Sequence, residues 1–146
     1  MARNVSVVSR QEELGGKSRF ERETDSFYSL LALVCDGMWA DDDYSPNRFE
    51  CPLVGYERAL KAMKAHVEKY KGESIESVNL DDFDSPIQGL FQYGDYSDDE
   101  EEAAVIFDRV VKELGGIEHI IKCMEELYKE RDKREGVTYI QFVVNN

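Results

Sequence analysis

The sequence lacks a hydrophobic run long enough to cross a membrane. No window approaches the roughly 18 consecutive apolar residues of a transmembrane helix. The N-terminus, MARNVSVVSRQEELGGKSRF, also lacks the apolar stretch of roughly 7 to 15 residues that a secretory signal contains. Cysteine is scarce, since Cys35, Cys51 and Cys123 stand at wide, irregular spacing that does not suit a disulfide framework. These absences predict a cytoplasmic protein that does not bind membranes.

Motifs that carry chemistry are missing as well. The sequence has no G-x-S-x-G nucleophile elbow, no Walker loop and no G-x-G-x-x-G dinucleotide motif. His119 and Cys123 are four residues apart on one expected helix, and the other two cysteines would complete a Cys3His zinc site. No close cysteine pair supports that site. We therefore expect no catalytic residue, no cofactor and no metal, and the alternative is a carboxylate- or metal-dependent hydrolase.

Charge of one sign dominates the chain. Asp and Glu number 31 and Lys and Arg number 18, which gives a formal net charge of −13 over 146 residues. An acidic chain repels phosphate backbones, so direct nucleic-acid binding is not expected. At this length a folded chain buries about 70% of its unfolded surface. Because 42% of the residues are hydrophobic, they can fill one core. We expect a single domain over residues 1–146.

Most of the charge imbalance lies in one stretch. Residues 73–102 contain eleven acidic residues and no basic residue, whereas residues 1–35 carry five of each sign. Carboxylates without cations repel one another, and aromatic side chains among them are typical interface anchors. The alternative is that these acids only coat a loop and cap a helix. The predicted partner-binding residues are Asp81, Asp82, Asp84, Phe91, Tyr93, Asp95, Tyr96, Asp98, Asp99, Glu100, Glu101 and Glu102.

Apolar spacing predicts about four amphipathic helices. Apolar residues recur at i, i+3, i+4 and i+7 over residues 27–38, 56–70, 103–114 and 117–128. Ser97 and the acids that follow it are an N-terminal signal for the third helix. Gly115 and Gly116 separate the last two helices, which predicts a C-terminal antiparallel αα-hairpin.

Two short β-prone runs stand at the ends of the chain. Val5, Val7 and Val8 form one, and residues 137–144 form the other. They are expected to pair with each other or with a second subunit in a homodimer. Residues 40–54 contain turn formers and two prolines, which predicts a long loop. The predicted fold class is mainly α (α+β), with a small sheet formed by the N- and C-terminal strands.

One segment carries a resemblance to a known family. The run Gln88-Gly89-Leu90-Phe91-Gln92-Tyr93 precedes an acidic helix that closes at Glu113-Leu114-Gly115, and a second amphipathic helix follows. Over residues 80–128 this arrangement resembles a bacterial family of acidic DNA-mimic proteins, which have a Gly-Gly-Phe-x-Gln-Phe-Phe segment before a helix ending in an Ile-Gly-Ala turn. Here Gly89 has no second adjacent glycine, and one residue is missing between Phe91 and Gln92. The resemblance implies a mostly helical, non-catalytic competitor of DNA.

Together these patterns predict a non-catalytic acidic binding protein that inhibits a basic, nucleic-acid-binding protein partner, of the DNA-mimic or anti-defence type. An immunity protein that neutralises a basic toxin fits the charge equally well. A DNA mimic should compete with duplex DNA for its partner. An immunity protein should protect against one toxin and ignore DNA.

Overall fold

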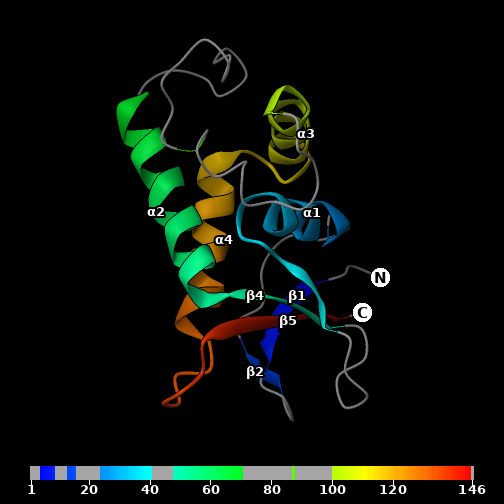
Figure 1. Cartoon of the computed structure of the whole chain (residues 1–146), viewed down its shortest axis with the longest axis vertical. Coiled ribbons are helices and arrows are strands. Elements are labelled where there is room, and N and C mark those ends of the chain that lie inside the picture. The colour runs from blue at the N-terminus through cyan, green and yellow to red at the C-terminus, as the bar shows by residue number, and fades with distance from the viewer. Residues whose placement is uncertain are drawn as a thin grey trace.

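A computed structural model describes residues 4–8, 13–15, 24–40, 48–70, 87 and 100–145. Within them the chain forms nine elements. In order these are β1 (Asn4–Val8), β2 (Glu13–Gly15), α1 (Thr24–Val34), β3 (Met38–Ala40), β4 (Arg48–Pro52), α2 (Leu53–Lys69), α3 (Glu100–Glu113), α4 (Ile117–Lys129) and β5 (Tyr139–Asn145). The fold is mainly α with a sheet, and the four helices predicted from apolar spacing are confirmed (Figure 1).

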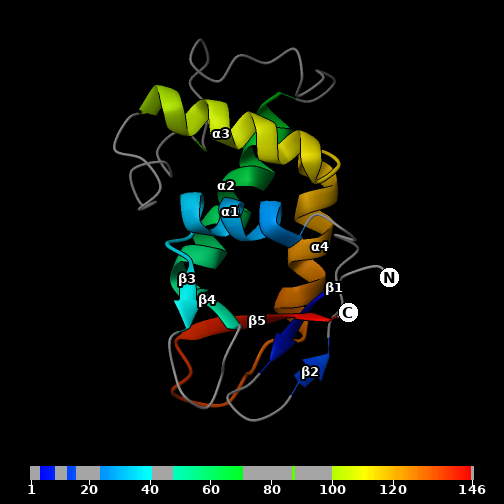
Figure 2. The ribbon, with the colours of Figure 1, turned by 90° about the vertical axis from the view of Figure 1, so that its right-hand side faces the viewer.

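The helices lie on one side of the sheet. In Figure 2, α3 and α1 run across the molecule one above the other, whereas α2 and α4 extend down to the sheet. α1 packs mainly against α3, and α2 packs mainly against α4. The sheet therefore closes one end of the molecule, and α3 lies at the opposite end.

The sheet joins both ends of the chain within one molecule. Its strand order is β2-β1-β5-β4-β3, and every neighbouring pair is antiparallel. β1 pairs with β5, with Asn4 opposite Asn145 and Val8 opposite Gln141. The predicted pairing of the terminal strands is therefore confirmed. On its other edge, β5 pairs with β4.

The prediction of a long loop over residues 40–54 is wrong in part. Residues 48–52 form β4 between β3 and β5, and residues 53 and 54 already belong to α2. Phe49 and Cys51 are buried while their neighbours in β4 are half-exposed, which is the period-2 pattern of a strand with one face on the core. Pro52 does not break this strand, because it is the last residue of β4 and the N-cap of α2, where a missing N–H costs little.

α1 ends earlier than its apolar pattern suggests. The apolar spacing extends over residues 27–38, but the helix stops at Val34. Asp36 adopts a left-handed backbone conformation with φ 57°, and the Gly37 N–H donates a 3.0 Å hydrogen bond to the carbonyl of Leu31. A Cβ atom on Gly37 would lie 2.4 Å from the ring of Phe49. Glycine is thus required where the chain turns from α1 into β3.

α3 and α4 do not form the predicted antiparallel hairpin. Gly115 and Gly116 do make the tight connection, with φ values of 95° and 102° that glycine adopts readily. Beyond this turn the helices diverge, as Figure 2 shows. α3 packs on α1, where the hydroxyl of Ser26 donates a hydrogen bond to the carboxylate of Glu113. The apolar faces of the two helices therefore have different partners.

Aromatic rings join the helical layers to the sheet. The ring centre of Phe142 on β5 lies 5.6 Å from that of Phe27 on α1, in an edge-on arrangement. It lies 5.9 Å from the ring centre of Tyr56 on α2. All three side chains are fully buried. Ile87 is buried in the same core, although its sequence neighbours lie outside the described residues. One continuous apolar cluster thus links α1, α2, α3, α4 and the sheet.

Candidate functional site

The predicted partner-binding surface is described only at its C-terminal end. Glu100, Glu101 and Glu102 form the first turn of α3, where the positive end of the helix dipole stabilises carboxylates. The other predicted partner-binding residues lie outside the described residues: Asp81, Asp82, Asp84, Phe91, Tyr93, Asp95, Tyr96, Asp98 and Asp99. Their role as a binding surface stays a prediction from the sequence.

The described elements on either side of residues 73–99 place both ends of that stretch. α2 ends at Lys69 and α3 begins at Glu100, and both ends lie away from the sheet in Figures 1 and 2. Ile87, near the middle of the stretch, is fully buried in the core. The described elements that flank the acidic stretch therefore end and begin at the helical end of the fold, and Ile87 is buried in the core.

The part of the chain whose side chains are described is electrically balanced. Residues 26–38, 48–70 and 103–142 carry twelve acidic and twelve basic residues. The remaining residues of the sequence carry nineteen acidic and six basic ones, and eleven of those acids fall in residues 73–102. The net charge of −13 is thus a property of particular segments, because the described core contributes none of it.

Charged groups on α2 and α4 interact with each other. The ammonium of Lys64 lies 3.4 Å from the carboxylate of Glu125, an ion pair between α2 and α4. The hydroxyl of Tyr128 donates a 2.6 Å hydrogen bond to Glu57, and this bond raises the pKa of Tyr128. The guanidinium of Arg131 lies 3.8 Å from the centre of the Tyr128 ring. These charged and polar side chains of α2 and α4 therefore have partners within the protein.

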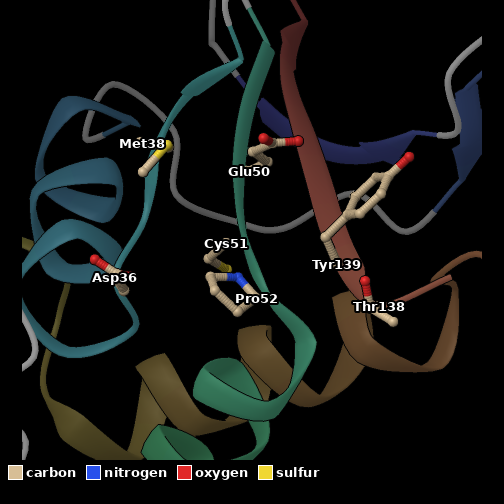
Figure 3. Close-up of a pocket in the computed structure, with 7 residues that line it drawn as sticks. All are labelled: Asp36, Met38, Glu50, Cys51, Pro52, Thr138 and Tyr139. Carbon is tan, nitrogen blue, oxygen red and sulfur yellow. The ribbon is translucent and has the colours of Figure 1, made fainter.

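A small pocket opens where β3, β4 and the start of β5 meet (Figure 3). Its volume is about 200 Å³. In Figure 3 the carboxylate of Glu50 extends from β4 toward β5, the strand that carries Tyr139. The Nε2 atom of Gln141 donates a 2.9 Å hydrogen bond to Glu50, which fixes the position of that carboxylate. The lining residues are Asp36, Met38, Glu50, Cys51, Pro52, Thr138 and Tyr139.

The three cysteines are free and buried. Burial raises the pKa of the Cys51 thiol well above its usual value, and a hydrogen-bond contact with the Cys35 thiol raises it further. Cys123 contacts His119 instead, with 3.5 Å between Sγ and Nε2. Among the described residues no group of three or more His, Cys, Asp or Glu side chains is placed to hold a metal ion. The helical spacing of His119 and Cys123 places these two side chains in contact with each other.

Sequence reasoning did not identify the pocket. Its carboxylates come from the end of α1 and from β4, and its opposite wall comes from Thr138 and Tyr139, more than eighty residues further along the chain. The only local signal is the alternation in residues 48–52, which places Glu50 and Pro52 on one face of a strand. The pairing of β4 with β5, which brings Tyr139 opposite Pro52, carries no local signal.

Comparison of the chain with known protein families, with curated proteins and with solved structures finds no match. Among the described helices, none is both long and apolar enough to cross a membrane.

Proposed function

We propose that this protein is a non-catalytic acidic binding protein that inhibits a basic, nucleic-acid-binding protein, in the manner of a DNA mimic or an anti-defence inhibitor. One observation carries the proposal. The described core is electrically neutral, while residues 73–102 hold eleven acids and no base. Charge that served only solubility would be spread over the surface. Its confinement to one stretch favours a dedicated surface for a cationic partner.

The physical consequence is electrostatic steering. A run of carboxylates close together in the sequence attracts a positively charged cleft, which speeds association and makes binding sensitive to salt. Glu100, Glu101 and Glu102 open α3 at one end of the run, and Ile87 is anchored in the core within the same stretch. A cleft that binds the phosphates of DNA by releasing counterions presents the complementary charge. The partner would then be unable to hold DNA and this protein together.

The test is capture of a partner from a lysate at low and at raised salt, followed by competition with duplex DNA. The informative variant changes Asp98 and Asp99 to Asn and residues 100–102 to Gln, and leaves Ser97 unchanged. A matched control removes five acids from the balanced part of the chain. It carries Glu68→Gln, Glu118→Gln, Glu126→Gln, Glu130→Gln and Glu135→Gln.

We expect the wild type and the control to retain a basic protein at low salt and to release it at raised salt or on addition of duplex DNA. The variant at residues 98–102 should retain far less of it while remaining folded. Retention that ignores salt, or that survives in the 98–102 variant, contradicts the proposal. A captured toxin whose binding ignores DNA would instead identify an immunity protein.

A further inference from the structure

The pocket beside β4 combines apolar walls with negatively charged groups. Met38 and Pro52 supply apolar surface and Glu50 and Asp36 supply carboxylates, whereas the ring of Tyr139 extends away from Glu50 on the far side of β5 (Figure 3). No Lys or Arg lines it among the described residues, and neither carboxylate forms an ion pair with a described base. The side chain of Met38 is 51% exposed and Thr138 is exposed, so the pocket opens to the surface.

The position of Asp36 adds to the negative potential. It follows α1 directly, where the helix dipole places partial negative charge, and α1 has no basic residue in its last turn. Burial raises the pKa of the neighbouring Cys51 thiol, and the charges of Glu50 and Asp36 act on it in the same direction. The carboxylates of Glu50 and Asp36 therefore act on one small space that contains no compensating cation from the described chain.

A hydrogen bond from a buried side chain fixes the position of Glu50. The side chain of Gln141 is only 3% exposed and donates from Nε2 to the Oε2 atom of Glu50. This bond leaves the second carboxylate oxygen of Glu50 as a free acceptor. The Oε1 atom of Gln141 is itself a buried acceptor with no hydrogen-bond partner. Gln141 itself lies beside the pocket and is not one of its lining residues.

We propose that the pocket binds the side chain of a lysine residue presented by another polypeptide. Its volume of about 200 Å³ is smaller than the roughly 300–1,000 Å³ of sites for drug-sized ligands and suits one extended side chain. The methylene stem packs along Met38 and Pro52, and the ammonium donates to Glu50. The sheet lies at the opposite end of the described fold from α3, so this site is remote from residues 100–102 at the start of α3 (Figure 2).

The test uses a lysine side chain without the rest of a partner. N-acetyl-L-lysine methylamide is titrated into the ¹⁵N-labelled full chain at millimolar concentrations, with the N-acetyl-norleucine analogue as a neutral control of similar shape. We expect amide shifts that saturate at Glu50 and Tyr139 with the lysine compound and not with the neutral one. The 98–102 variant should give the same shifts, which separates this site from the proposed partner surface.

Two substitutions remove charge while keeping the fold. Glu50→Gln retains an acceptor for Gln141, and Asp36→Asn suits the left-handed backbone that Asn tolerates well. For half-exposed ion pairs of this kind, each change should weaken binding of the lysine compound about three- to fivefold. The control Glu68→Gln, on α2, should have no effect. The proposal fails if the neutral compound shifts the same amides equally, or if Glu50→Gln binds lysine as tightly as the wild type.

Discussion

The hydroxyl of Tyr56 on α2 donates a 2.7 Å hydrogen bond to the backbone carbonyl of Met124 on α4. Both residues are fully buried, and burial raises the pKa of Tyr56 well above its usual value, so the hydroxyl stays protonated as a donor. The ring of Tyr56 also stacks on Tyr128, with 6.1 Å between centres, and contacts Phe142 of the sheet. One side chain thus fixes the position of α4 relative to α2 and β5.

We expect Tyr56→Phe to lower the free energy of unfolding by about 1–2 kcal/mol, because the ring packing is kept while a buried hydrogen bond is lost. Urea denaturation followed by circular dichroism measures the change. The matched control is Tyr128→Phe, which removes an exposed hydrogen bond to Glu57 and should cost less. Equal losses for the two variants would show that burial does not govern the strength of the Tyr56 bond.

A second prediction concerns the turn from α1 into β3. An added Cβ on Gly37 would lie 2.4 Å from the Phe49 ring and 3.0 Å from the Leu31 backbone, so Gly37→Ala must displace buried groups. We expect a loss of about 1–3 kcal/mol in the free energy of unfolding, as for overpacked cores. The double variant Gly37→Ala/Phe49→Leu should regain part of that loss relative to Phe49→Leu alone. No recovery would mean that the Leu31 backbone contact dominates.

The helices were predictable because each carries its own signal. The apolar residues of α4 fall on one face whatever the helix packs against, so spacing alone identifies residues 117–128. The direction of packing has no such signal. Gly115 and Gly116 predict a tight turn, but whether α3 then lies on α4 or on α1 depends on which apolar faces meet in three dimensions. The five residues of β4 were likewise predicted as a loop. They form a strand because they pair with β5, which places Phe49 opposite Phe142 and Pro52 opposite Tyr139.

The two candidate sites also differ in whether the sequence predicts them. Counting charges along the sequence identifies residues 73–102, because that property is local. The pocket requires that β4 pairs with β5 and that α1 ends at Val34, after which the chain turns at Asp36, and neither fact follows from spacing. Glu50 and Gln141 illustrate the difference, since they are 91 residues apart in sequence and share a hydrogen bond.

The third prediction concerns pH. His66 on α2 is only 1% exposed and its ring lies 4.8 Å from Tyr70. Burial lowers the pKa of His66, and the charge of Lys69 lowers it further. Above the pKa of the unfolded chain, about 6.5, both states hold a neutral imidazole. Below it the unfolded state takes up the proton more readily, so folding loses stability as the pH falls.

His66→Gln should remove this component of the pH dependence. We expect the difference in unfolding free energy between wild type and variant to shift against the wild type between about pH 7 and pH 5. The unfolding free energies are measured by urea denaturation at both pH values. Both proteins carry the same carboxylates, so the contribution of these groups cancels from the difference. A difference that stays constant across this range would show that the native imidazole titrates as it does in the unfolded chain.

The fourth prediction concerns thiol reactivity. Cys35, Cys51 and Cys123 are each at most 1% exposed, and the thiolate is the reactive form. The native protein should therefore react slowly with an aromatic disulfide reagent at mildly alkaline pH, and all three thiols should react at once in denaturant.

Of the three, Cys123 should be labelled first in the native state, because the His119 imidazole 3.5 Å away can accept its proton, whereas the pKa of Cys51 is raised. Mass spectrometry of peptides after short labelling gives the order, and His119→Ala should abolish the lead of Cys123. Labelling of Cys51 ahead of Cys123 would contradict this order, because it would mean that access to the pocket outweighs the cost of forming a buried thiolate.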